Sequence, residues 1–238
     1  MADDQAIFNP SSAEKMALRI LCFGASITAG WSAGGSHHYP YSSQLSARLA
    51  DALPATHFSI EVDGLSGDTL INGQYTNRMQ QDMKSVKVAY DWVIIQAGGN
   101  DLGWGREPQT IFSALKPFWE IPLSTGANVL ALTVTEHGND NAEQFAQRVA
   151  LNDLISNYTD SNHTIAGGNY YVADVATAIP YKTMSKSDRK LFWSDDTHFT
   201  QAGYALMGDV IADRLIDLVH GNDTTLNSTG AMKATFKL

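Results

Sequence analysis

Cysteine is nearly absent from this 238-residue sequence, and the single Cys22 excludes an intramolecular disulfide. Cys22 lies inside an apolar run, residues 18–23, where a buried and unreactive thiol is the expected role of a lone cysteine. Without cross-links, the chain depends on a hydrophobic core, and its 44% hydrophobic residues are sufficient to build one. The length suits one large domain better than two.

Positive charge is also scarce. Sixteen lysine and arginine residues stand against 25 aspartate and glutamate residues, which gives a formal net charge of −9. No basic run is present that could displace counterions from phosphates, so nucleic acid is disfavoured as a partner. The charge balance places no restriction on a neutral small molecule, and it does not indicate an oligomeric state.

Long apolar runs are missing as well. No segment offers the ~18 unbroken apolar residues of a membrane span. The first residues, MADDQAIFNP, are acidic and have neither the basic nor the apolar region of a secretory signal. We therefore expect a soluble, cytoplasmic protein, with a secreted protein as the alternative if a signal was removed. Four Asn-x-Ser/Thr triplets matter only in that second case; they begin at Asn157, Asn162, Asn222 and Asn227.

The sequence does contain a recurring unit, in which an apolar run is followed by a glycine-rich or polar loop and an amphipathic segment. Several of the runs are nearly continuous in Val, Ile and Leu, as expected of strands buried on both faces. Strands are predicted at residues 18–23, 57–63, 91–97, 127–134 and 169–175. Strands that alternate with helices predict a parallel sheet with right-handed crossovers, in a three-layer α/β/α sandwich.

Apolar residues recur at helical spacing in three segments, residues 40–53, 141–158 and 200–219, the last with Thr200 as N-cap. Their expected buried faces are Leu45, Leu49 and Leu53 in the first, Phe145, Val149, Leu154, Ile155 and Tyr158 in the second, and Met207, Val210, Ile211, Leu215 and Leu218 in the third. We expect one domain over residues 18–220, preceded by an N-terminal extension (1–17) and followed by a polar tail (221–238).

In sheets of this kind, ligands bind in the loops that follow the carboxyl ends of the strands. Ser26 follows the first strand in FGASITAGW, Gly67 follows the second in GLSGDT, and Asn100 follows the third in AGGNDLGWG. The first segment is not the Gly-x-Ser-x-Gly elbow of α/β-hydrolases, since Thr28 stands in the place of the second glycine. Taken singly, segments of these kinds are usually only a helix cap or a turn.

Near the C-terminus, the segment FWSDDTHFT places Asp195 and His198 three residues apart. At that spacing the carboxylate can accept a hydrogen bond from imidazole Nδ1–H, which leaves Nε2 free to take a proton from Ser26. A metal site is the weaker interpretation, because the other histidines have no companion ligand spacing and the only cysteine lies in a strand. We therefore expect no metal.

In their order along the chain, these four blocks resemble the SGNH hydrolase family, also called GDSL esterases and lipases, from Leu18 to about Val219. The resemblance implies the flavodoxin-like SGNH hydrolase fold with a central, mainly five-stranded parallel sheet. It also implies a serine esterase that needs no cofactor and whose partner is a small-molecule ester. The site residues that it implies are Ser26 as nucleophile, His198 as base and Asp195 as its orienting acid, with Ser26, Gly67 and Asn100 as the oxyanion hole.

The chain departs from the family pattern at one position, because Ala25 stands where the family has the Asp of Gly-Asp-Ser. Ala25 cannot make the contacts of that carboxylate. Asp196 is a rival to Asp195 for the acid role, although the family spacing favours Asp195.

Four aromatic residues near the motifs are candidates for a pocket wall, and packing at the core edge is an equal alternative for each: Trp31, Tyr39, Trp104 and Trp193. Because the sequence has no long apolar lid, short-chain acyl or acetyl esters are the expected substrates. A carbohydrate O-acetylesterase is the alternative activity. An inactive SGNH-fold binding module and a metal-dependent phosphoesterase are the remaining alternatives.

Overall fold

The computed structural model describes residues 17–158 and 167–221. Residues 1–16 of the expected N-terminal extension and 222–238 of the expected tail lie outside the described residues, and so do Asn162, Asn222 and Asn227. The expected domain boundaries therefore stay a prediction.

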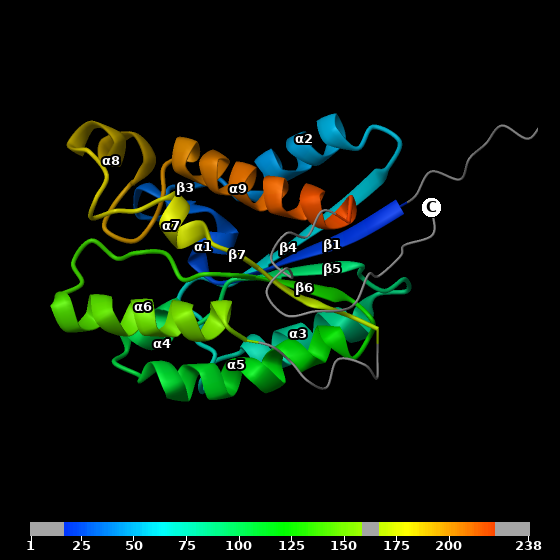
Figure 1. Cartoon of the computed structure of the whole chain (residues 1–238), viewed down its shortest axis with the longest axis horizontal. Coiled ribbons are helices and arrows are strands. Elements are labelled where there is room, and N and C mark those ends of the chain that lie inside the picture. The colour runs from blue at the N-terminus through cyan, green and yellow to red at the C-terminus, as the bar shows by residue number, and fades with distance from the viewer. Residues whose placement is uncertain (1–16, 159–166, 222–238) are drawn as a thin grey trace, which may run out of the picture.

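In the part of the chain that the structure describes, a central sheet has five parallel strands in the order β4-β1-β5-β6-β7 (Figure 1). The strands are β1 (Ala17–Gly24), β4 (His57–Gly64), β5 (Trp92–Ile95), β6 (Asn128–Leu132) and β7 (Tyr170–Ala173). The predicted parallel sheet is thus confirmed. The edge strand β4 alternates in burial along its first half, whereas β5 is buried throughout because helices cover both of its faces.

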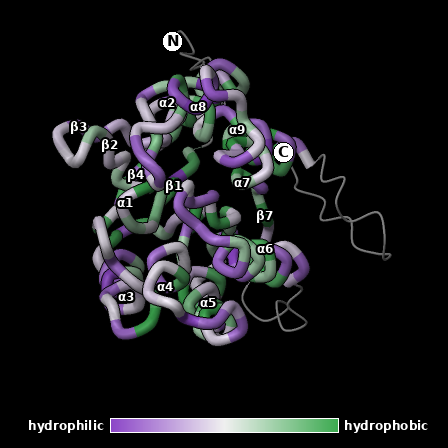
Figure 2. The backbone as a smooth tube through the Cα atoms, turned by 90° about the vertical axis from the view of Figure 1, so that its left-hand side faces the viewer, coloured by the Kyte–Doolittle hydropathy of each residue, from purple (hydrophilic) through white to green (hydrophobic). Residues whose placement is uncertain are grey.

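Helices cover the sheet on both sides. α2 (Ser42–Ala52) and α9 (Gln201–Val219) lie on one face, and α3 (Tyr75–Ser85), α5 (Pro108–Leu123) and α6 (Ala142–Ser156) lie on the other (Figures 1 and 2). Side chains of β1 alternate between the two layers. Ile20 and Cys22 pack toward α2 and α9, and Leu21 and Phe23 pack toward α3 and α5. This confirms the three-layer sandwich.

The remaining elements are short and follow the strands or connect them. α1 (Ser26–Ala29) follows β1, α4 (Gly99–Gly103) follows β5, and α7 (Val175–Ala178) follows β7. α8 (Lys186–Phe192) precedes α9, and a small antiparallel pair, β2 (Trp31–Ser32) and β3 (His37–His38), encloses the 3₁₀ turn Ala33–Gly35. None of the described helices is long and apolar enough to cross a membrane.

The three predicted helices correspond to α2, α6 and α9, and the side chain of Thr200 caps α9 by accepting from the backbone N–H of Gly203. The predicted buried face of α6 is partly wrong. Val149 is exposed, and the buried positions include Arg148 together with Leu151 and Ile155. An arginine is tolerated on this face because Asp140 pairs with it.

Helices α3 and α5 have no counterpart among the predicted segments. α3 has a strongly polar sequence and buries only Tyr75 and Met79. α5 contains Pro117 and Pro122, and proline inside a helix removes a backbone hydrogen bond. Packing against the sheet therefore outweighs unfavourable local sequence in both helices.

Cys22 is fully buried in β1, on the side of α2. Burial raises the pKa of its thiol to about 12, and the hydrogen bond with Tyr41 offsets this only in part. The interpretation of Cys22 as a buried thiol is confirmed.

Candidate active site

Ser26 is the first residue of α1, directly beyond the carboxyl end of β1. The turn that places it there is tight. A Cβ atom at Gly24 would lie 2.2 Å from Thr28 Oγ1 and 2.9 Å from the backbone oxygen of Gln96, so only glycine fits. Ser26 is therefore held at the edge of the sheet, where its hydroxyl lines a cavity.

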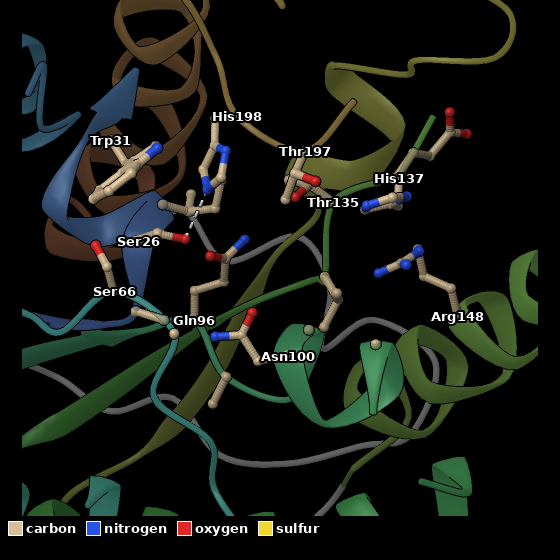
Figure 3. Close-up of a pocket in the computed structure, with 18 of the residues that line it drawn as sticks. Ser26, Trp31, Ser66, Gln96, Asn100, Thr135, His137, Arg148, Thr197 and His198 are labelled. Carbon is tan, nitrogen blue, oxygen red and sulfur yellow. Dashed lines mark hydrogen bonds between the residues drawn. The ribbon is translucent and has the colours of Figure 1, made fainter. Parts of the chain in front are cut away.

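Asp195, His198 and Ser26 form one chain of hydrogen bonds. The Nε2 atom of His198 lies 3.0 Å from Ser26 Oγ, and its Nδ1 atom lies 3.0 Å from Asp195 Oδ2 (Figure 3). Burial raises the pKa of the Asp195 carboxyl, but hydrogen bonds from the backbone N–H groups of His198 and Thr197 outweigh it and hold the pKa below its ordinary value. Because an ionised carboxylate only accepts, Nδ1 carries the proton and Nε2 is free to accept from Ser26.

The loop that carries His198 is fixed at both ends. Trp193 and Phe199 form a β-bridge, and Ser194 N–H donates to the backbone oxygen of His198 at 2.8 Å. Trp193 is buried and packs on Phe199, with ring centroids 4.3 Å apart. This indole therefore belongs to the core that supports the loop, and it does not line the cavity.

Asp196, the rival acid, faces another loop. Its Oδ1 atom accepts from Tyr181 Oη at 2.7 Å and its Oδ2 atom from Asn139 Nδ2 at 2.6 Å. Its backbone oxygen accepts from Gly138 N–H at 2.7 Å. Of the two neighbouring carboxylates, one contacts His198 and the other holds the loop between β6 and α6.

Gly67, on the loop after β4, and Asn100, in the short helix α4, line the same cavity as Ser26. Gly67 has a φ of +80°, which favours glycine, and it lines the cavity. One N–H of the Asn100 carboxamide donates to the backbone oxygen of Asp68 at 2.7 Å, and the carboxamide has a second N–H. The buried carboxylate of Asp101 accepts from the backbone N–H groups of Leu70 and Ile71, which fastens the Gly67 loop to α4.

Arg78 of α3 connects the first two loops. Its guanidinium donates to Asp68 Oδ2 at 2.7 Å, to Asp63 Oδ1 at 2.6 Å and to the backbone oxygen of Gly24 at 3.2 Å. Ala25 offers no carboxylate to the loop, and this arginine supplies a cross-link beside it. No motif or spacing in the sequence singles out Arg78, because its partners come from segments distant in the chain.

The cavity has a volume of about 670 Å³, which is typical of small-molecule sites. Of the candidate aromatic residues, Trp31 and Trp104 line it, whereas Tyr39 does not and instead stacks on His37. Among the described residues, no group of three or more His, Cys, Asp or Glu side chains could hold a metal ion. Several lining residues were not singled out as site residues in the sequence: Ser66, Gln96, Thr135, His137, Arg148 and Thr197 (Figure 3).

Comparisons with known proteins bear on the family and the fold of the chain. The model of the GDSL-like Lipase/Acylhydrolase family matches residues 22–206. Among curated proteins, no sequence is significantly similar to the chain.

Solved structures share the fold at low identity. A member of the lipolytic protein G-D-S-L family from Veillonella parvula is 19% identical with a TM-score of 0.64, and the match covers 82% of this chain and 97% of that one. A carbohydrate esterase family 3 protein from Talaromyces cellulolyticus is 16% identical with a TM-score of 0.63, covering 85% and 98%. The aryl esterase of M. smegmatis is 19% identical with a TM-score of 0.62, covering 84% and 99%.

Proposed function

The chain belongs to the GDSL-like lipase/acylhydrolase family, and on that premise we propose that it is a serine esterase that hydrolyses short-chain carboxylic esters. The observation that carries the proposal is the continuous hydrogen-bond chain from Asp195 through His198 to Ser26, at the wall of a ligand-sized cavity. The aryl esterase and the carbohydrate esterase that share the fold support an esterase in general, without selecting the ester.

In the first half of the proposed reaction, Ser26 Oγ attacks the ester carbonyl carbon while His198 Nε2 takes the hydroxyl proton. The carbonyl π electrons move onto the oxygen. When the tetrahedral intermediate collapses, the bond to the alcohol breaks and the imidazolium gives its proton to the leaving oxygen. Asp195 holds the imidazole in the required tautomer and stabilises its positive charge.

Negative charge on the former carbonyl oxygen needs hydrogen-bond donors. We assign this role to the backbone N–H groups of Ser26 and Gly67 and to the second N–H of Asn100. Asn100 is already oriented by Asp68, so little reorganisation accompanies the appearance of charge. In the second half, water attacks the acyl carbon, His198 takes its proton, and the acid leaves as the proton returns to Ser26 Oγ.

Replacing Asn100 tests the oxyanion assignment. We expect Asn100→Ala to lower kcat for p-nitrophenyl acetate by roughly two orders of magnitude, because one donor is lost from the transition state. Steady-state kinetics measures this effect, and Asn157→Ala is the matched control, since the Asn157 carboxamide also donates to a backbone oxygen, that of Asp153, but lies outside the cavity. An unchanged kcat in Asn100→Ala would remove Asn100 from the oxyanion hole.

The cavity walls also predict the length of the acyl group. Apolar side chains at the site, such as Ile27, Val134 and Trp31, are interrupted by Gln96 and Thr135, so a long alkyl chain has no continuous apolar surface. We expect kcat/KM to be highest for p-nitrophenyl acetate to butyrate and to fall steadily toward decanoate. A series of p-nitrophenyl esters measures this directly, and a maximum at decanoate would contradict the short-chain assignment.

A further inference from the structure

We propose that the far end of the cavity is a binding site for the leaving alcohol, in which Arg148 donates hydrogen bonds to an uncharged, polyhydroxylated alcohol. This inference rests on the proposed esterase function and adds the chemistry of the alcohol to it. We call this end, formed by Thr135, His137, Asp140 and Arg148, the β6–α6 subsite.

The position of the subsite relative to His198 assigns it to the alcohol. The leaving oxygen must lie against His198 Nε2, because that nitrogen returns its proton. Thr197, the neighbour of His198, lines the cavity between His198 and His137 (Figure 3). The rest of the alcohol, which is attached to the leaving oxygen, therefore lies against the β6–α6 subsite.

Arg148 has donors available there. It is 6% exposed, and its Nε atom donates to Asp140 Oδ2 at 2.7 Å. Within the described residues, neither Nη1 nor Nη2 has a hydrogen-bond partner, and the guanidinium is directed from α6 into the cavity (Figure 3). A buried arginine that keeps two terminal nitrogens without a protein acceptor is suited to bind acceptor oxygens of a ligand.

The loop that forms the subsite is held in place before any ligand binds. Asn139 and Gly138 donate to Asp196, and Glu136 Oε2 accepts from the backbone N–H groups of Tyr181 and Lys182 at 2.6 Å. A capping box, in which Asn141 and Gln144 each bond the other's backbone, fixes the start of α6. A pre-organised site of this kind loses little conformational entropy on binding.

The charges favour a neutral ligand. Asp140 neutralises Arg148 at 2.7 Å, and the Glu136 carboxylate of the lining offsets the Lys182 ammonium, which donates to the backbone oxygens of Gly138 and Asp140, so an anionic alcohol gains no net attraction. Hydroxyl groups can accept from Arg148 and pair with Thr135 and the other polar side chains. At the cavity mouth the indole of Trp104 is 77% exposed, a surface suited to the C–H face of a polyol or sugar ring.

The test compares esters with one acyl group and different alcohols. We expect kcat/KM of the wild type to be about tenfold higher for 2,3-dihydroxypropyl acetate than for propyl acetate, as one charge-assisted hydrogen bond would give. This ratio should fall about tenfold in Arg148→Met, mainly through KM. Because that variant leaves the buried Asp140 without its guanidinium partner, Arg148→Met with Asp140→Leu replaces the whole ion pair and keeps the fold testable by thermal unfolding.

Arg48→Met is the matched control, since Arg48 forms ion pairs with Asp209 and Asp213 on the far side of the sheet, and it should leave the ratio unchanged. The subsite is overturned if the wild type has equal kcat/KM for the two acetates. It is also overturned if the double variant keeps the wild-type ratio of kcat/KM for the dihydroxypropyl ester to that for the propyl ester. In both cases the esterase function stands. Faster hydrolysis of O-acetyl-lactate than of the dihydroxypropyl ester would contradict the proposal that the alcohol is uncharged. Failure of the wild type to hydrolyse any of these esters, p-nitrophenyl acetate included, overturns the esterase function and the subsite with it.

Discussion

Ser26→Ala is expected to reduce kcat for p-nitrophenyl acetate by roughly a millionfold, to the level of the uncatalysed reaction plus what binding alone provides. The variant removes the atom that would form the acyl-enzyme and leaves His198 without a proton to accept. Steady-state assays, with the unfolding temperature measured in parallel, separate this loss of chemistry from a loss of fold. Turnover that persists in a well-folded Ser26→Ala protein would contradict the proposed nucleophile.

Ser66→Ala is the matched control for the nucleophile, because Ser66 also lines the cavity but has no hydrogen bond to His198. A fluorophosphonate probe should label the wild type and Ser66→Ala, and it should not label Ser26→Ala. The same experiment addresses the alternative of an inactive binding module, which predicts that even the wild type remains unlabelled.

Asp195→Asn is the second substitution with a large expected effect, a fall in kcat of about ten-thousandfold. The new Oδ1 atom can still accept from the backbone N–H groups of Thr197 and His198, so the loop keeps its shape. The amide Nδ2, however, donates a hydrogen bond toward His198 Nδ1, at the position where the Asp195 carboxylate accepts one. The imidazole is then favoured in the tautomer with its proton on Nε2, which cannot accept from Ser26.

Asp196→Asn is its matched control, since it removes one negative charge at the adjacent position. Asp196 accepts from Tyr181 and Asn139 and does not contact His198. We expect a loss of activity far smaller than that of Asp195→Asn, together with a weaker preference for the dihydroxypropyl ester, because the β6–α6 loop loses part of its support. The reverse ranking of the two variants would transfer the acid role to Asp196.

The features that were predicted correctly from the sequence are those with a local signal. The sequence predicts a buried strand at β5, around Val93 and Ile94, because a strand covered on both faces needs no polar positions. Thr200 reads as an N-cap because the cap bonds only within its own turn. α5 has no such local signal, because packing of Phe118 and Trp119 in the core stabilises it in spite of its internal prolines.

The candidate site also contains features with a local sequence signal and features without one. The sequence by itself determined the fold class and the family, and it predicted Ser26 and His198 with an acid from the pair Asp195 and Asp196, because these residues follow strands in a fixed order or lie within one short loop. Only the tertiary structure decided which carboxylate faces His198, that Trp193 lies in the core, that Arg78 joins loops from other parts of the chain, and that Arg148 directs its guanidinium into the cavity. Burial and side-chain direction depend on contacts between segments far apart in sequence, and such contacts leave no periodic pattern that a linear reading could detect.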